Sequence, residues 1–198
     1  MFRWLLTSAA VLAVALGWYQ LFTFSSTPGA QLAAPAHWPR EIPLPSASHV
    51  PLLLVFIHPR CSCTPATLQQ LGQILSSTHT TVPAAVQIAL VVYRSQTVNP
   101  DTYPATFEPA KFLHTPAQIL PDPNGLLARR FGAATSGEIV LYAADGHLLF
   151  QGGITPMRSQ TGRSAGAEAL RNALATGATQ RKAASVFGCP IFFPGHAR

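Results

Sequence analysis

Residues 52–65, LLLVFIHPRCSCTP, constrain the fold more than any other part of the sequence. They open with a continuous apolar run of strand length, which is typical of a strand buried on both faces of a sheet. Two of the chain's three cysteines, Cys61 and Cys63, follow this run and are separated only by Ser62. We therefore expect the strand to deliver a cysteine pair at one edge of a sheet.

The segment directly after the cysteines, residues 64–75, predicts a helix. Thr64 is a plausible N-cap, and Pro65 suits the first helical position. Apolar residues then recur on one face of the expected helix: Leu68, Leu71, Ile74 and Leu75. The cysteine pair should consequently lie at a helix N-terminus.

The remaining pattern predicts a mixed α/β sheet flanked by helices. Further strands are expected at residues 84–93 and 118–120, and a helix is expected to start near Asp122 and end near Gly132. The turn dipeptide Asp145-Gly146 indicates a hairpin, and a last helix is expected over residues 164–175. The early alternation of strands and helices requires parallel crossovers, and the hairpin then adds antiparallel strands.

The N-terminus predicts a transmembrane helix. Residues 4–24 carry no charge and would span about 32 Å as a helix, enough for a hydrocarbon core of about 30 Å. Arg3 precedes the run, so the positive-inside tendency leaves everything after residue 25 outside the cytoplasm. A cleaved signal peptide is the alternative, with small residues at 30–36. The length of the apolar run favours an uncleaved anchor.

These features divide the chain into four parts: an anchor over residues 1–25, a proline-rich linker over 26–50, a domain over 51–176 and a tail over 177–198. We expect the linker to be a semi-extended spacer. The predicted location is a single-pass protein of the inner membrane, with its globular domain in an oxidising periplasm where disulfides persist.

The strand, cysteine turn, helix and late hairpin resemble the thioredoxin-like superfamily. The segments HPRCSCT, TSGEIVLY, GGIT and VFGCP are similar to those of the RedB-like group of membrane-anchored thioredoxin-like proteins. This resemblance implies a thioredoxin-like domain that exchanges disulfides with protein thiols or disulfides in the periplasm. It also implies that Cys61, at the end of the strand segment, is the attacking thiolate, with Cys63 as the resolving thiol.

Elementary electrostatics supports reactive cysteines at this position independently of the resemblance. A helix N-terminus exposes unpaired N–H groups and carries about half a positive charge, which stabilises a thiolate. Arg60 adds a neighbouring positive charge, and His58 is a candidate proton acceptor. We also expect Cys61 to be the more exposed and Cys63 the more shielded of the two thiols, and access favours the outer one as nucleophile.

The sequence departs from the family pattern in two places. Only one residue separates Cys61 and Cys63, where the family has two, so a disulfide between them should be strained and labile. The family's cis-proline is replaced by residues 134–137, Ala-Thr-Ser-Gly, which leaves the substrate-docking edge uncertain. Cys189, in an apolar tail segment, is a candidate third redox thiol, and its alternative is a buried small residue.

A copper-binding protein that uses the same cysteines is the alternative function, because thiolates and histidines are ligands for Cu(I). The available histidines are His114, His147 and His196, and no spacing singles one out. Four-ligand zinc would need a second cysteine pair. Residues 135–137, Thr-Ser-Gly, lack the G-x-S-x-G frame of a hydrolase nucleophile. No phosphate-loop spacing is present either, so no nucleotide or other cofactor is predicted. The +6 net charge is scattered, without the basic stripe of a nucleic-acid binder.

Overall fold

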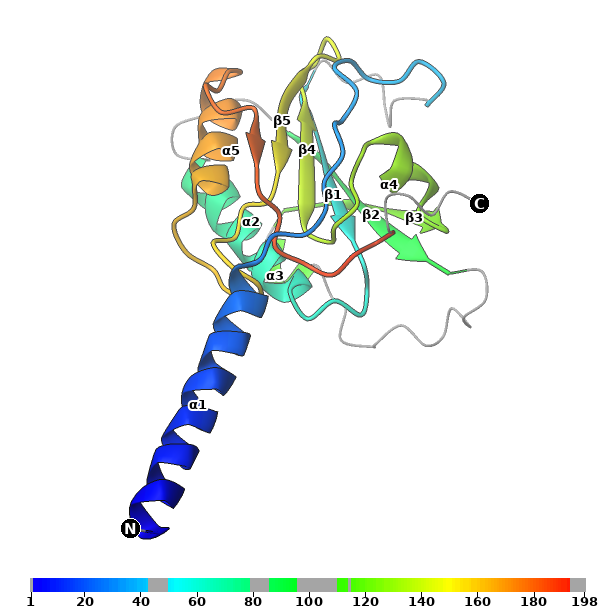
Figure 1. The fold of residues 1–198 in the computed structure, drawn as a ribbon. Helices are drawn as coiled ribbons and strands as arrows, with labels where there is room; N and C mark the ends of the chain where they lie inside the picture. Colours follow the sequence, from blue (N-terminus) through cyan, green and yellow to red (C-terminus); the bar gives the residue numbers. More distant parts are fainter. Residues whose placement is uncertain (1, 43–49, 79–85, 96–109, 114, 193–198) are drawn as a thin grey trace.

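The computed structural model describes residues 2–42, 50–78, 86–95, 110–113 and 115–192 (Figure 1). Its helices are α1 (Phe2–Ser26), α2 (Thr64–Thr78), α3 (Ala110–Leu113), α4 (Leu126–Arg130) and α5 (Ala165–Thr176). Its strands are β1 (Leu52–Ile57), β2 (Gln87–Arg94), β3 (Gln118–Pro123), β4 (Glu138–Tyr142), β5 (Leu148–Gly152) and β6 (Ala183–Ala184).

The strands form one mixed sheet in the order β3-β2-β1-β4-β5-β6. β1, β2 and β3 run parallel to one another, while β4 pairs antiparallel with both β1 and β5. The hairpin expected around Asp145-Gly146 is confirmed as the connection between β4 and β5. The thioredoxin-like mixed sheet flanked by helices, expected from the sequence, is therefore the fold of this domain.

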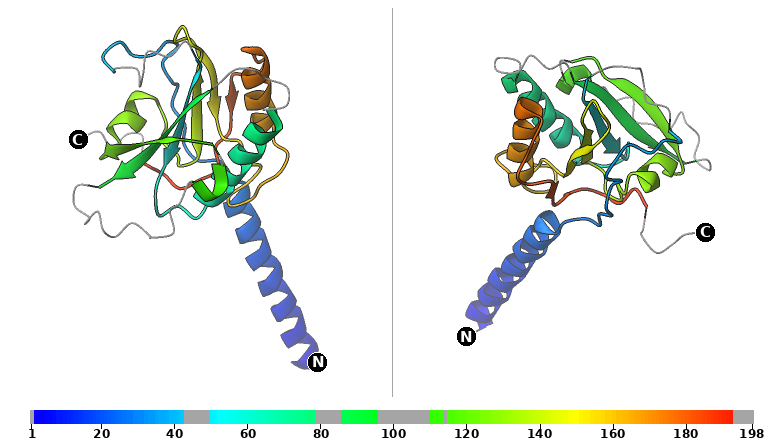
Figure 2. Two further views of the ribbon diagram at one scale, coloured as in Figure 1. Left: turned by 180° about the vertical axis from the view of Figure 1, so that it is seen from behind. Right: turned by 90° about the horizontal axis from the view of Figure 1, so that it is seen from above.

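Strand β1 is buried along its whole length, as its apolar run predicts. Because side chains alternate across a strand, it contributes to two separate cores. Leu53, Val55 and Ile57 pack with the apolar faces of α2 and α5. Leu54 and Phe56 pack on the other side of the sheet, where α4 lies (Figure 2). The predicted apolar face of α2 is confirmed, because its four residues lie in the first core.

A segment that we call the N-terminal strap, residues 27–38, runs along the domain in extended form. The Leu32 N–H donates to the Gly132 carbonyl at 3.0 Å. The Trp38 N–H donates to the Gly146 carbonyl, in the β4–β5 turn, at 2.8 Å. The strap therefore follows the sheet from the end of α1 as far as the hairpin.

This arrangement differs from the spacer expected over residues 26–50, in the part of that range that the structure describes. Ala34 is buried, and the ring of Trp38 lies 5.1 Å from that of Phe131. Proline removes a hydrogen-bond donor only at its own position, so a proline-rich segment still packs where its other residues are apolar. The proline content of this segment therefore does not predict whether it packs on the domain.

The tail also lies on the domain. Its β6 pairs with β5, and Thr135 and Pro190 form an antiparallel bridge. Ile191 and Phe192 are buried in the same core as Phe56. This burial explains the apolar character of the segment, which the sequence showed without indicating where it packs.

Helix α1 projects away from the domain (Figures 1 and 2). Its residues Leu6–Ser26 are long and apolar enough to cross a membrane, and their side chains are not covered by the domain. A membrane anchor and a signal sequence both have this length and composition.

Gln151, on β5, joins the strap to the sheet. Its Oε1 accepts a hydrogen bond from the Ala34 N–H at 2.8 Å. Its Nε2 donates to the Leu32 carbonyl at 2.6 Å and to Glu138 Oε1 at 2.7 Å. Burial raises the pKa of Glu138 to about 8, so this carboxyl is largely protonated at neutral pH. One glutamine side chain thus forms hydrogen bonds with three polar groups of the strap and the sheet.

We expect Gln151→Ala to destabilise the domain by about 2–4 kcal/mol, because an unpaired buried polar group costs about 1–3 kcal/mol and two groups, the Ala34 N–H and the Leu32 carbonyl, lose their side-chain partner. The measurement is the free energy of unfolding of the full chain in detergent, from urea titration. Gln180→Ala is the matched control, since Gln180 is exposed. Equal stabilities of the two variants would contradict the role of this network.

Candidate functional site

Cys61 and Cys63 lie in the turn between β1 and α2, as the sequence predicts. The Cys61 N–H donates to the His58 carbonyl at 2.9 Å, and the Thr64 N–H donates to the Cys61 carbonyl at 3.1 Å. The Cys63 carbonyl accepts the Thr67 N–H at 3.1 Å, which is the first bond of α2. Cys63 therefore takes the N-cap place that was expected for Thr64, and both cysteines lie at the helix N-terminus.

The two thiols differ strongly in acidity. A hydrogen bond from the Cys63 thiol stabilises the Cys61 thiolate and lowers the pKa of Cys61 to about 7, against the opposing effect of burial. The same bond raises the pKa of Cys63, and burial raises it further. Cys61 is thus partly ionised at neutral pH while Cys63 keeps its proton. This asymmetry is what a nucleophile and a resolving thiol require.

Exposure does not distinguish them. Cys61 is 4% exposed and Cys63 is 3% exposed, so the expectation that Cys61 is the more accessible thiol is wrong. The cover over Cys61 includes the tail, which no local sequence pattern places there. The difference in their acidity therefore rests on hydrogen bonding rather than on contact with solvent.

Cys189 lies beside Cys61, although 128 residues separate them in the chain. Its N–H donates to Cys61 Sγ at 3.3 Å, and the two thiols also interact. The tail is held there by two backbone hydrogen bonds of an antiparallel pair. The Ser136 N–H donates to the Cys189 carbonyl at 2.8 Å, and the Ile191 N–H donates to the Ala134 carbonyl at 2.7 Å. The structure therefore brings all three sequence-predicted cysteines together, each as a free thiol.

The loop of residues 134–137, where the resemblance led us to expect a cis-proline, contributes to the site. Ser136 Oγ accepts a hydrogen bond from the His58 N–H at 2.9 Å, which fixes the turn before Cys61. The Gly137 N–H donates to the Phe56 carbonyl at 2.8 Å. The described residues contain no cis peptide bond. The backbone edge of residues 134–136, whose role the missing proline left open, pairs with the chain's own tail.

Ser159 belongs to the site and was missed by sequence reasoning. Its Oγ lies 3.5 Å from Cys63 Sγ and 3.3 Å from the Ser62 carbonyl oxygen. A hydrogen bond from this hydroxyl favours the Cys63 thiolate, against the larger opposing effect of Cys61. The residue has a positive φ of 57° in a loop between β5 and α5. A single serine in a polar loop carries no sequence signal of such a contact.

His58 and Arg60 flank the turn. The imidazole is half-buried and stacks on Tyr93 with ring centroids 5.2 Å apart. Its Nδ1 accepts a hydrogen bond from the Arg60 N–H at 3.3 Å. Burial lowers the pKa of His58, and the Arg60 charge lowers it further. His58 is therefore a neutral base at neutral pH, and its part in proton transfer stays a hypothesis.

The histidines proposed as copper ligands are not gathered at the thiols in the described part of the chain. His147 bonds Asp145 in the β4–β5 turn, at the opposite end of the sheet from Cys61. His114 and His196 lie outside the described residues. Among those that are described, no group of three or more His, Cys, Asp or Glu side chains is arranged to hold a metal ion.

No protein-family model matches this chain, and no curated protein matches it. Among solved structures, it is similar to a hypothetical protein of Sinorhizobium meliloti 1021, at 19% identity and a TM-score of 0.57 over 85% of this chain and 96% of the other. It is also similar to an uncharacterised conserved protein of Geobacillus kaustophilus, at 18% identity and a TM-score of 0.56 over 87% and 92%. At such identities the likeness concerns the fold alone.

A third match is a secreted Mycobacterium tuberculosis disulfide oxidoreductase described as homologous to E. coli DsbE. It is 18% identical, with a TM-score of 0.43 over 65% of this chain and 83% of the other. At this TM-score the match does not indicate the function of this chain.

We expect the alkylation rate of Cys61 to rise with pH around a midpoint near 7, because the thiolate is the reactive form. Cys63→Ala removes the hydrogen bond that stabilises this thiolate and should move the midpoint upward. Cys63→Ser, which keeps a donor, should move it less. The measurement is iodoacetamide labelling of the Cys61 peptide by mass spectrometry between pH 5 and pH 10. Identical midpoints in all three chains would contradict this origin of the acidity.

Proposed function

We propose that the chain is a membrane-anchored thiol–disulfide oxidoreductase that works through the Cys61/Cys63 pair, with Cys189 as a third redox thiol. The observation that carries this proposal is the paired, opposite shift in acidity of two thiols at the N-terminus of α2. A structural role would not require one thiol to be ionised and the other protonated beside it.

The exchange follows from the two protonation states. The Cys61 thiolate attacks one sulfur of a partner disulfide, the partner's S–S bond breaks, and the departing sulfur leaves as a thiolate. Cys63 then loses its proton and attacks the Cys61 sulfur. A Cys61–Cys63 disulfide forms and the second partner sulfur is released. Two electrons pass from the cysteine pair to the partner. The Cys63 proton and one proton from solvent convert the two partner thiolates to thiols, and the reverse sequence oxidises a partner dithiol.

Cys189 offers a second route for the resolving step. A disulfide between Cys61 and Cys63 must close over a single intervening residue, whereas Cys189 approaches Cys61 from a separate segment. In this route the Cys189 thiol loses its proton and attacks the Cys61 sulfur of the mixed disulfide, whose S–S bond breaks and releases the partner sulfur as a thiolate. The same electron balance holds, and the disulfide that forms joins the tail to the turn before α2.

We also infer that α1 is an uncleaved anchor with the domain on the periplasmic side, and that residues 51–176 are the redox domain. The 21-residue apolar span and the single preceding Arg3 support this orientation. The partners are then protein thiols or disulfides of that compartment. The RedB-like resemblance stays a prediction, and no contact among the described residues favours the copper alternative.

Variants of single cysteines should separate the roles. Cys63→Ser should accumulate mixed disulfides with a partner through Cys61, because one of the two candidate resolving thiols is absent. Cys61→Ser should form far fewer, because the low-pKa thiol is absent and burial still raises the pKa of Cys63 after its bond to the Cys61 sulfur is lost. The measurement is non-reducing electrophoresis with mass mapping after exposure of the full chain to a protein disulfide. Equal trapping by both variants would refute the roles, and neither variant trapping while purified wild type retains stoichiometric copper would favour the metal-binding alternative.

The third thiol has its own test. In Cys63→Ser, a Cys61–Cys189 disulfide should form as the mixed disulfide decays, because the two thiols interact directly. Adding Cys189→Ser should lengthen the lifetime of the mixed disulfide at least about tenfold, since no resolving thiol then remains in the chain. Unchanged lifetimes would mean that Cys189 is only a packing residue of the tail.

A further inference from the structure

The end of α1 is joined directly to the loop that precedes α5. The Arg158 N–H donates to the Ser25 carbonyl at 3.0 Å, and its Nε donates to the Phe24 carbonyl at 3.0 Å. Its Nη2 donates to the Thr27 carbonyl at 3.4 Å. The guanidinium also lies 4.8 Å from the centroid of the Phe24 ring, a cation–π contact. These contacts bring the domain against the last turn of the helix, with no spacer between them.

The next residue in the same loop is Ser159, whose hydroxyl contacts Cys63 Sγ at 3.5 Å. Because consecutive Cα atoms are 3.8 Å apart, the Cys63 sulfur lies within about 14 Å of the Ser25 carbonyl. The loop therefore connects the end of the helix to the thiol pair in two successive residues.

The other side of the site is joined to the same point. Arg158 Nη1 donates to the Gly188 carbonyl, and Gly188 directly precedes Cys189. The Gly29 N–H, three residues after α1, donates to the Val186 carbonyl at 2.8 Å. The tail that covers Cys61 is thus held at the base of the helix, as the Ser159 loop is.

We propose that the thiol site faces the membrane surface, and that its redox partner is an integral membrane protein whose cysteines lie in a short segment at that surface. This inference rests on the proposed redox function and anchor. A span that ends at Ser26 places that residue at the edge of the hydrocarbon core. The headgroup layer beyond it is roughly 5–8 Å thick, so the Cys63 sulfur lies at most about 6–9 Å past the headgroups.

This position selects partners by size and attachment. A folded soluble protein cannot approach a sulfur in the narrow space between the domain and the bilayer. A cysteine on a short loop of a membrane-embedded chain lies at about the same distance from the bilayer as the Cys63 sulfur. The β4–β5 turn, in contrast, lies at the other end of the sheet, about 20 Å further along strands of five or six residues.

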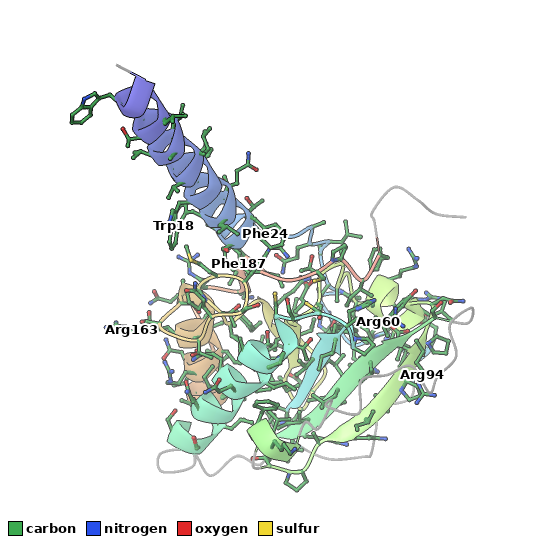
Figure 3. The ribbon with its side chains drawn as sticks, turned by 90° about the horizontal axis from the view of Figure 1, so that it is seen from below. Trp18, Phe24, Arg60, Arg94, Arg163 and Phe187 are labelled. Atoms are coloured by element: carbon green, nitrogen blue, oxygen red, sulfur yellow. The ribbon has the colours of Figure 1, made fainter. Side chains whose placement is uncertain are left out.

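The charges around the helix base fit a surface that faces lipid. In the view from below, the side from which α1 projects, Arg163 and Arg60 lie on either side of the helix base, with Phe187 beside it (Figure 3). Both arginines are exposed. Basic residues close to a bilayer are attracted by anionic lipids. Apolar and basic side chains therefore lie together around the base of α1, on the face that contains the site.

The orientation has a test that needs no redox activity. The full chain, with its three cysteines changed to serine, is reconstituted in vesicles of phosphatidylcholine and phosphatidylglycerol, and one new cysteine carries a fluorophore. A lipid with a headgroup quencher should quench the label in Ser62→Cys several-fold more than in Asp145→Cys, which lies in the β4–β5 turn. Gln160→Cys, in the Ser159 loop, replaces Ser62→Cys if labelling there disturbs the fold. Equal quenching at both ends of the domain would overturn the proposal.

The partner class is tested with Cys63→Ser in the same vesicles. Two synthetic transmembrane peptides carry one cysteine as a chromogenic mixed disulfide. In one the cysteine lies three residues beyond the apolar segment, and in the other a 15-residue proline spacer of about 45 Å intervenes. We expect at least tenfold faster chromophore release from the short peptide. Equal rates, or a faster long peptide, would overturn the proposal.

Arg158→Ala should reduce this preference, because it frees the Ser159 loop and the tail from the helix end, whereas Arg181→Ala, at an exposed position, should keep it. A preference unchanged in Arg158→Ala would show that this residue does not set the orientation. A small soluble disulfide separates the two hypotheses. If Cys61 fails to react even with it, the proposed function is wrong, and the quenching measurement alone decides whether the site faces the membrane.

Discussion

The burial of β1 on both faces is the constraint on which the rest of the structure depends. A strand with no exposed side needs neighbours on both edges and a layer above and below it, which makes it central in the sheet. Its chain must then leave the core at the strand's end, and it does so directly at the turn that contains Cys61. Helix α2 begins there because it must return along the sheet to cover Leu53 and Val55. The position of the cysteines is therefore a consequence of how the core is closed.

Within that position, contact between the thiols matters more than the helix alone. A helix terminus favours a negative charge on either sulfur, so it cannot by itself make two neighbouring cysteines different. The hydrogen bond between them does, because its donor must keep a proton while its acceptor loses one. A shift from 9 to about 7 for Cys61 corresponds to about 3 kcal/mol of preference for the thiolate. A thiol whose pKa is close to the ambient pH is also the best attacking group, since lower values reduce nucleophilicity.

The sequence predicted those parts of the structure that local patterns encode. The apolar run of β1, the helical spacing after Pro65 and the Asp145-Gly146 turn each depend on neighbouring residues, and together they indicate the sheet. The paths of the strap and the tail depend on pairing between distant segments, such as Thr135 with Pro190, which no periodicity reveals. Ser159 was missed for the same reason, and the relative exposure of the two cysteines was wrong because the tail's position was unknown. Cys189 was proposed only because an unpaired cysteine in an oxidising compartment needs an explanation.

Burial of the thiols and their reactivity must be reconciled. Disulfide exchange requires direct contact between sulfurs, yet Cys61 and Cys63 are almost inaccessible. A partner sulfur therefore reaches them only when the tail or the Ser159 loop moves aside. Both segments are bonded to Arg158, and Arg158 is bonded to the end of α1. A movement of the domain relative to α1 would consequently move the tail and the Ser159 loop as well. Access to the two sulfurs therefore depends on how the domain is attached to the end of α1.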